Sequence, residues 1–547
     1  MFKWLKSGSP WIWLTGGAVS ISLLSVLGLL LLIGWKGLSY FWPAPLYQWQ
    51  TQQGETLVGQ LYAEEYVPIS HLKEMDIELP AQVEEKGLVK RLSIKIANRD
   101  INPADFISLL ELDLLEQTKP SGWAIVERTR GGDFFGVPQG YYHGNEVSAD
   151  HIGNMANGLA FASTLRDEID RLVTKQIRVL SAQAEQLRLE KRRRELNNNL
   201  DQNFITRYDT QTRIISQQLI EMEAELDRLR AQLIEQGLVI VDMHGDSYKI
   251  PLSDILDIWY PNQMSLLDKI GHWATQAWKF LSDDPRESNS EGGVFPAMFG
   301  TVLMVLIMSV IVMPLGVIAA IYLHEYAKNN AFTRIIRVAV INLAGVPSIV
   351  YGVFGLGFFV YTLGGSIDSL FYAERLPAPT FGTPGLLWSA LTLAVLTLPV
   401  VIVATEEGLT RIPSSVRHGS LALGATQFET MWRIVLPMAS PAIITGLILA
   451  VARAAGEVAP LMLVGVVKLA STLPVDSQFP FLHLERKFMH LGFHIYDVGF
   501  QTTNIETARP LVYATSFLLV TVIIGLNLTA ISIRNNLREK YRTLGQD

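Results

Sequence analysis

Two ionisable residues, Arg453 and Glu457, lie inside a long apolar stretch, in the run Arg-Ala-Ala-Gly-Glu-Val-Ala-Pro-Leu. Side chains four residues apart share one face of an α-helix, so we expect the pair to point the same way. A charge at the centre of a membrane span costs ~2.5–3.5 kcal/mol on insertion scales, and such residues usually face protein or a wet pathway. An arginine fork can hold an oxyanion through paired hydrogen bonds. The pair therefore predicts either an anion site or two charges that only neutralise each other.

Glu457 can play two roles at an anion site. It can offset the charge of Arg453, so that the anion is not held permanently, or it can accept a hydrogen bond from a protonated oxyanion. The second role would favour hydrogen phosphate over sulfate, because sulfate carries no proton near neutral pH. Both roles remain open from the residues alone.

Six nearly uncharged windows of about 20 residues would form the membrane spans that position this pair, since ~30 Å of hydrocarbon at 1.5 Å per residue requires that length. The short segments flanking them hold twelve Lys and Arg residues on one side and six on the other, which predicts that both termini are cytoplasmic. The first window is too long for a signal-peptide core, and we interpret it as a retained helix. The windows run from Trp11 to Trp35, Val294 to Leu323, Ile335 to Leu363, Leu386 to Ala404, Ala442 to Val467 and Leu511 to Ser532.

A polar region, residues 43–293, separates the first span, in residues 1–42, from the membrane core, residues 294–547. This topology places the region outside the cytoplasmic membrane. Period-two alternation and β-rich runs predict a β domain from 46–150 and 237–262. Residues 157–236 carry apolar residues at coiled-coil spacing with a polar break in the middle. We expect an antiparallel coiled-coil hairpin, either a rigid spacer or a docking arm, and a linker over 281–293.

The segment 406–437 follows the fourth span and contains two short amphipathic stretches that meet at Gly424. Glycine can take the positive φ that a sharp turn between helices needs. We predict a compact helix-turn-helix on the cytoplasmic face, and the alternative is an interfacial amphipathic connector.

This segment resembles the EAA loop of bacterial ABC importers, in which a glycine is followed after nine residues by Ile-x-Leu-Pro. Gly424 and the run from Ile434 to Pro437 match that spacing, whereas His418 occupies the usual acidic position and Gly419 replaces the usual alanine. The resemblance implies that the loop inserts into an ATP-binding subunit and transmits its closure to the spans. The residues it assigns to this loop are Glu406, His418, Gly419, Ser420, Gly424, Ala425, Ile434, Leu436 and Pro437.

The run from Arg453 to Leu461 resembles the Arg-Ala-Ala-Gly-Glu-Thr-Ala-Pro-Leu signature of PstA-type phosphate permeases, with Val458 in place of the threonine. A second match is Gly-Val-Pro-Ser-Ile-Val-Tyr-Gly from Gly345 to Gly352, where we expect Pro347 to kink the third span. The Ala-Pro pair favours PstA over its partner permease PstC. The substrate-pathway residues assigned in this way are Arg453, Gly456, Glu457, Pro347, Ser348 and Tyr351.

The resemblance implies a mainly α membrane protein with six transmembrane helices and a type I ABC importer core, located in the bacterial inner membrane. It also implies three kinds of partner besides lipid: a PstC-like permease, two copies of a PstB-like ATPase and a PstS-like phosphate-binding protein. The chain has no Gly-x-x-x-x-Gly-Lys-Ser/Thr loop, so ATP hydrolysis is assigned to another chain. Rival interpretations are a permease for sulfate or molybdate, and an envelope-spanning sensory scaffold.

Composition restricts the remaining chemistry. The chain has no cysteine, which excludes disulfides and thiolate metal sites. Its formal net charge of −7 gives no reason to expect nucleic acid as a partner. We assign no catalytic residue, no metal ligand and no cofactor.

Overall fold

The computed structural model describes residues 9–52, 54–69, 88–102, 104–286, 291–328, 330–502 and 505–543. The chain forms two compact units. One unit contains Phe41–Lys279, and the other contains Met1–Tyr40 together with Phe280–Asp547. The first is the β-containing unit and the second is the membrane unit.

Two antiparallel sheets form the β-containing unit, as the alternating segments predicted. Trp49 and Ile94 fill the core of the first sheet, and Leu238 and Ile240 that of the second. The first sheet has the order β4-β3-β2-β1-β5, with β1 Leu46–Thr51, β2 Thr56–Pro68, β3 Leu88–Lys95, β4 Phe106–Leu110 and β5 Leu114–Thr118. The second has the order β10-β9-β7-β6-β11, with β6 Ala124–Arg128, β7 Phe134–His143, β9 Gln236–Val241, β10 Ser247–Pro251 and β11 Ile255–Trp259, and β8 Glu146–Ser148 pairs with β7.

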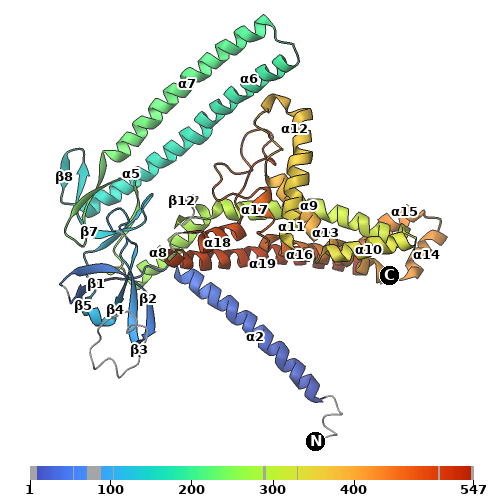
Figure 1. The fold of residues 1–547 in the computed structure, drawn as a ribbon, viewed down its shortest axis with the longest axis horizontal. Helices are drawn as coiled ribbons and strands as arrows, with labels where there is room; N and C mark the ends of the chain where they lie inside the picture. The colour runs from blue at the N-terminus through green and yellow to red at the C-terminus, as the bar shows by residue number, and fades with distance from the viewer. Residues whose placement is uncertain are drawn as a thin grey trace. The chain divides into compact units, whose positions relative to one another are not determined.

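A long helical hairpin is inserted between β8 and β9 (Figure 1). Its first arm is α5 His151–Arg171, a π-helical stretch Leu172–Ile177 and α6 Arg178–Leu196, and its second arm is α7 Gln202–Ile234. The first arm starts at His151 rather than at the predicted 157, because the Asp150 carboxylate accepts a hydrogen bond from the Gly153 N–H at 3.2 Å and caps the helix.

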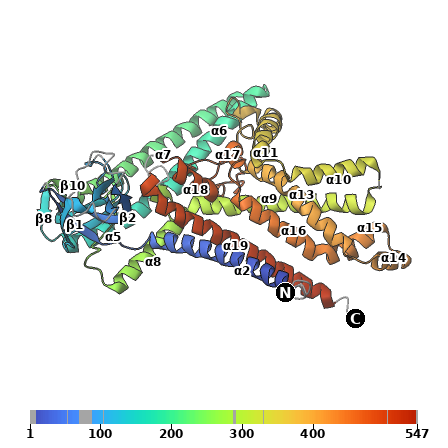
Figure 2. The same cartoon turned by 60° about the horizontal axis from the view of Figure 1, so that its bottom comes forward.

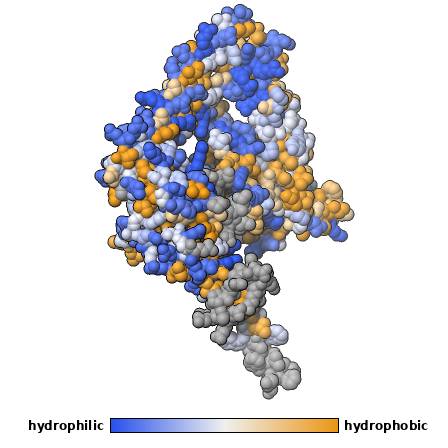
Figure 3. Space-filling view, turned by 60° about the vertical axis from the view of Figure 1, so that its left-hand side comes forward, coloured by the Kyte–Doolittle hydropathy of each residue, from blue (hydrophilic) through white to orange (hydrophobic). Residues whose placement is uncertain are grey.

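Among the residues that the structure describes, the hairpin shares its core with the sheet at the base of the two arms. Leu165 and Leu172 from the first arm and Leu229 and Leu233 from the second share one buried core with Leu238 of β9. Farther out, α6 has no buried residue, and Figure 3 shows that hydrophilic side chains dominate the surface of the hairpin at the top of the view. The outer part therefore adds length and a polar surface more than a core.

Helix α8, Leu266–Ser282, follows the second sheet and was not predicted from the sequence. The segment 281–293, predicted as a linker, contains the end of α8 and two short paired strands, β12 Pro285–Arg286 and β13 Glu291–Gly292. Glu291 and Gly292 pair back onto Pro285 and Arg286, and Gly292 takes a φ of +86°. The linker prediction was therefore wrong for the described part of this segment.

Six helices of the described membrane unit are long and apolar enough to cross a membrane, the number expected from the sequence. They are α2 Ser9–Ser39, α9 Phe295–Ile321, the run from α11 Ser348–Phe354 through a π-helical stretch to α12 Gly365–Phe371, α13 Leu386–Thr410, the run from α15 Gln427–Thr430 to α16 Leu436–Gly456, and α19 Ile505–Thr543.

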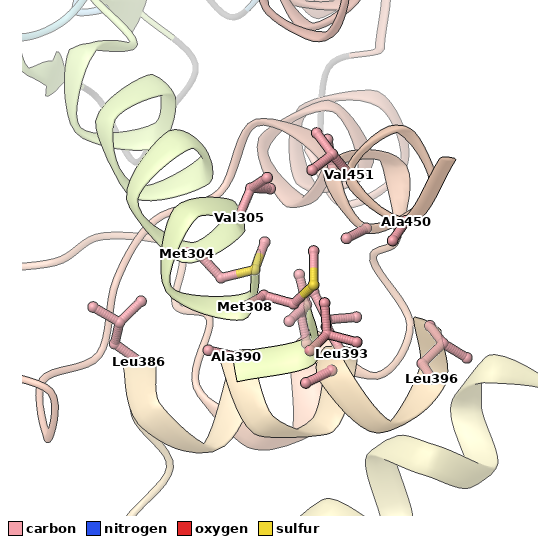
Figure 4. Close-up of a cluster of buried hydrophobic side chains, with 14 of the residues drawn as sticks. Met304, Val305, Met308, Leu386, Ala390, Leu393, Leu396, Ala450 and Val451 are labelled. Atoms are coloured by element: carbon pink, nitrogen blue, oxygen red, sulfur yellow. The ribbon is translucent and has the colours of Figure 1, made fainter. Parts of the chain in front are cut away.

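Helices α9, α13 and α16 form the centre of this unit (Figure 2). Met304 and Met308 of α9 meet Leu393 of α13 and Ala450 of α16 in one buried cluster (Figure 4). Gly446 lets α16 approach α13 closely, because a Cβ there would lie 2.7 Å from the Ala404 side chain. Small residues at the crossing therefore allow dense packing where no hydrophobic effect operates between helices.

The predicted third span was wrong at its start. Helix α10, Ala331–Leu343, is separate, and the next helix begins at Ser348, with Pro347 in an extended conformation as its N-cap. Proline lacks an N–H and fixes φ, so it starts a helix more easily than it continues one. The helix is therefore fully interrupted at Pro347, and the span is not a continuous helix with a kink.

The predicted fifth span was wrong at both ends. Its helix begins at Gln427 within the loop segment and ends at Gly456, not at Val467. Glycine is a weak helix former, and Pro460 could not donate the next helical hydrogen bond to the Gly456 carbonyl. The following chain forms α17 Leu461–Val464 and, after a loop, α18 Leu491–Phe500.

Candidate functional site

Arg453 and Glu457 lie at the end of α16 and not in the middle of a span. Arg453 belongs to the last helical turn, whereas Glu457 has φ −78° and ψ 131° and is already extended. The expectation that both share a helix face was therefore wrong, yet the chain still turns them toward each other: Arg453 Nε lies 3.7 Å from Glu457 Oε1. That distance is an ion pair without a short hydrogen bond.

Both side chains of this pair remain partly open. The Arg453 side chain is 34% exposed and that of Glu457 is 22% exposed. A basic residue in the last turn also interacts favourably with the negative end of the helix dipole. The guanidinium is thus held in place by local charges while part of its donor fork stays accessible to an anion.

The second sequence motif packs directly beside the first. A Cβ on Gly352 would lie 2.7 Å from Pro460 Cα, so only glycine permits this approach of α11 to the segment after Glu457. Tyr351 is buried, donates its hydroxyl hydrogen bond to the Leu343 carbonyl at 2.5 Å, and interacts electrostatically with Arg453. Tyr351 therefore connects α10, across the Pro347 break, with the Arg453 site.

The other two assigned residues of this motif, Pro347 and Ser348, show no direct link to Arg453 among the residues described. Pro347 is exposed, and Ser348, half-buried, is the first residue of α11. Within the described part of the chain, no hydrogen bond or ion pair joins either residue to Arg453. Gly456 is exposed, and its position has no atom within 4 Å of where a Cβ would be, so its role is to end the helix.

A buried polar cluster on α18 lies next to this site and was missed in the sequence. His490, His494 and Asp497 are each at most 2% exposed, and Lys468 Nζ lies 3.1 Å from Asp497 Oδ2. A Cβ on Gly492 would lie 2.8 Å from the Val458 side chain. The cluster therefore packs against the residue that follows Glu457. Histidines four residues apart in an apolar segment were the available signal.

Burial keeps both histidines uncharged. It lowers the pKa of His490 to about 3, and burial together with the Lys468 charge lowers the pKa of His494 to about 4. The ring nitrogens of His494 have no hydrogen-bond partner within the described residues. The cluster therefore combines two uncharged histidines with the ion pair of Lys468 and Asp497.

The loop 406–437 forms the helix-turn-helix that the sequence predicts. Helix α14, Ser414–Ala422, is followed by its C-cap Leu423 and by Gly424, which has a φ of +89°. The Ala425 N–H bonds to the Ser420 carbonyl and the Gly424 N–H to the Leu421 carbonyl, which is a Schellman motif. Thr426 and Glu429 then form a capping box that starts α15.

The two halves of this turn are joined by a buried contact, the 2.8 Å hydrogen bond between Ser420 Oγ and Thr430 Oγ1. Ala425, Ile434, Leu436 and Pro437 are half-buried between the turn and the start of α16. The loop is thus a rigid unit, which is what transmission of a displacement requires.

The outer face of the loop is apolar and exposed. Leu423 is 91% exposed, Phe428 68% and Trp432 63%, and the Phe428 and Trp432 rings stack with centroids 6.3 Å apart. His418 and Gly419 are exposed beside them. Aromatic side chains on a compact loop are typical anchors for a protein partner.

The inner side of the loop is tied to two spans by charged groups. Arg417 Nη2 lies 3.0 Å from Glu325 Oε1 and donates to the Leu409 carbonyl at 2.7 Å. Glu406 lies 3.7 Å from Arg337 Nε of α10. These contacts would therefore transmit a movement of α14 to the ends of α9, α10 and α13.

Comparison with known proteins shows the family to which the chain belongs. Residues 312–543 match the family described as binding-protein-dependent transport system inner membrane component. The chain is 35% identical over 245 residues to the phosphate transport system permease protein PstA 1 of Mycobacterium tuberculosis (strain ATCC 25618 / H37Rv), covering 44% of this chain and 70% of that protein.

Two further similarities extend the comparison. The probable ABC transporter permease protein YqgI of Bacillus subtilis (strain 168) is 30% identical over 259 residues, covering 46% of this chain and 82% of that protein. A solved structure of the inward-facing MetNI methionine ABC transporter is 18% identical with a TM-score of 0.32, covering 45% of this chain and 94% of that one. The chain belongs to the family of binding-protein-dependent transport system inner membrane components, and it is a multi-pass inner-membrane permease subunit of an ABC importer.

Proposed function

We propose that this permease subunit imports inorganic phosphate. The observation that carries the proposal is the partly exposed Arg453 side chain, whose Nε lies 3.7 Å from Glu457 Oε1 where α16 ends. PstA permeases named for phosphate transport are among its relatives, at 34–36% identity over 31–44% of this chain.

Arg453 would bind the anion through its planar fork, which presents paired donors to two oxygens of a phosphate. Glu457 would accept a hydrogen bond from the proton of hydrogen phosphate, or would balance the arginine charge after release. Because their separation of 3.7 Å leaves them without a short hydrogen bond, the anion could replace this contact without first breaking a strong one.

The energy for transport would come from ATP hydrolysis on partner subunits. The permease would pair with a PstC-like homologue, dock a PstB-like ATPase dimer through Leu423, Phe428 and Trp432, and receive phosphate from a PstS-like binding protein. Both termini and the loop 406–437 would then be cytoplasmic, and the β-containing unit would be periplasmic, as the Lys and Arg distribution favours.

The test is phosphate uptake by the assembled transporter in vesicles. Arg453→Ala should abolish uptake while leaving assembly and basal ATP turnover unchanged, and Arg453→Lys should restore only part of it because an ammonium lacks the bidentate fork. Glu457→Gln tests the proton contact. Normal uptake by Arg453→Ala would exclude the proposed anion site.

A competition experiment separates phosphate from other oxyanions. Arsenate carries a proton near neutral pH as phosphate does, and it should inhibit uptake, whereas sulfate and molybdate should not. Inhibition by sulfate at similar concentrations would instead support the second candidate, a permease for a fully deprotonated oxyanion.

A further inference from the structure

Helix α8 presents its apolar face outward, away from the sheets. Its exposed large apolar residues are Leu266 at 67%, Leu267 at 80%, Ile270 at 47% and Trp278 at 69%. At 100° per residue these positions fall on one side of the helix, together with the exposed Gly271 and Ala274. A water-exposed helix normally has the opposite arrangement.

The polar face of α8 is the one that packs on the β-containing unit. Lys279 Nζ lies 2.9 Å from Asp257 Oδ2 and 3.5 Å from Glu127 Oε2. The Gln276 amide also reaches Glu127, at 3.4 Å, and the His272 ring lies 4.6 Å from that of Trp259 between centroids. These contacts fix the rotation of α8, so its apolar side cannot turn inward.

The end of α8 is joined to the start of a membrane span. The Val294 N–H donates to the Phe280 carbonyl at 2.8 Å, and the Phe295 N–H donates to the Asp283 carbonyl at 3.3 Å. Phe295 is the first residue of α9, and Phe280 is buried in the last turn of α8. The last turn of α8 is therefore hydrogen-bonded to the first residues of a helix that is long and apolar enough to cross a membrane.

We infer that α8 is a membrane-surface helix, whose face of Leu266, Leu267, Ile270 and Trp278 inserts into the interfacial region of the bilayer. Continuity with α9 favours lipid as the occupant of this face, since hydrogen bonds tie the helix end to a span. Tryptophan prefers the membrane interface, and an amphipathic helix lies there with its apolar side down. The inference does not depend on which solute the permease carries.

Site-directed spin labelling tests it on the intact chain, because the protein has no cysteine of its own. Leu267→Cys and Ile270→Cys are labelled with a nitroxide in the assembled transporter in lipid nanodiscs. Power saturation then compares collisions with oxygen, which concentrates in lipid, and with a water-soluble nickel chelate. Leu24→Cys on α2 is the lipid reference, and Ser216→Cys on the exposed hairpin is the water reference.

Labels at 267 and 270 should resemble the Leu24 label, with more contact to oxygen than to nickel. A nickel-accessible label resembling the one at Ser216 would overturn the inference. Labels protected from both reagents would also overturn it, and would show that a protein partner covers this face. Phosphate uptake by each labelled variant confirms that the transporter is intact.

Discussion

Arg417, on the loop 406–437, lies 3.0 Å from Glu325, at the end of the span that starts with α9. Both side chains are about one-fifth exposed, at 21% and 19%. Interaction energies within such partly buried networks are ~0.5–3 kcal/mol, enough to matter for coupling but not for folding. The ion pair joins α14 to the end of the span Phe295–Tyr326, and we propose that it helps to couple their movements.

A charge reversal tests this connection. Glu325→Arg should reduce substrate uptake roughly tenfold, because ~1.4 kcal/mol of lost coupling corresponds to that factor, while basal ATP turnover continues. The double variant Glu325→Arg with Arg417→Glu should recover much of the loss. Uptake and ATP turnover are measured together in proteoliposomes. A double variant no better than the single one would contradict a direct pairwise role.

Gly424 should be the least replaceable residue of the loop. Its φ of +89° costs any other residue ~1–2 kcal/mol, so Gly424→Ala should loosen the turn and weaken recovery of the ATP-binding subunit. Gly419→Ala is the matched control, because this exposed glycine lies inside α14 with nothing within 4 Å of its Cβ position. Co-purification from membranes is the measurement, and equal recovery for both variants would argue against a conformational requirement at 424.

Buried His494 should make the protein sensitive to acid. Burial first, and then the Lys468 charge, lower its pKa from 6.5 to about 4, so between these values the unfolded chain binds more protons and stability falls as pH falls. At pH 5 this site alone costs roughly 2 kcal/mol. His494→Leu should therefore shrink the drop in melting temperature between pH 7.5 and pH 5.

The exposed His418 supplies the control for this titration. His418→Gln removes a histidine whose side chain is exposed, and it is measured beside His494→Leu under the same conditions. If His494→Leu and the unmodified protein lose the same stability on acidification, another group is responsible.

The outer hairpin should be removable without loss of the fold. Replacing Ser181–Gln217 by a short Gly-Ser loop keeps the buried contacts of Leu172, Leu229 and Leu233 at the base. Thermal unfolding of the β-containing unit should shift little, since α6 contributes no buried residue. The two buried residues lost from α7, Phe204 and Ile215, do not belong to the core that the hairpin shares with the sheet. Phosphate uptake then separates two roles: a loss indicates a docking arm, whereas unchanged uptake indicates a spacer whose length is not limiting.

The local features of this protein could be predicted from its sequence. Six apolar windows predicted six spans, because crossing ~30 Å of hydrocarbon requires a run of about 20 apolar residues whatever lies beside it. The turn at Gly424 was predicted for a similar reason, since a positive φ selects glycine at that single position. Period-two alternation of apolar residues also predicted the β-rich segments.

Tertiary structure decided where helices end and which faces are covered. Gly456 and Pro347 could each have stood inside a kinked helix. In the structure one helix ends at Gly456, and another begins only after Pro347. The outward direction of the apolar face of α8 could not be predicted either. The residues that contact its polar face, Glu127 and Asp257, lie outside the helix in the sequence. Hydropathy records how apolar a segment is, whereas long-range contacts determine what each face touches.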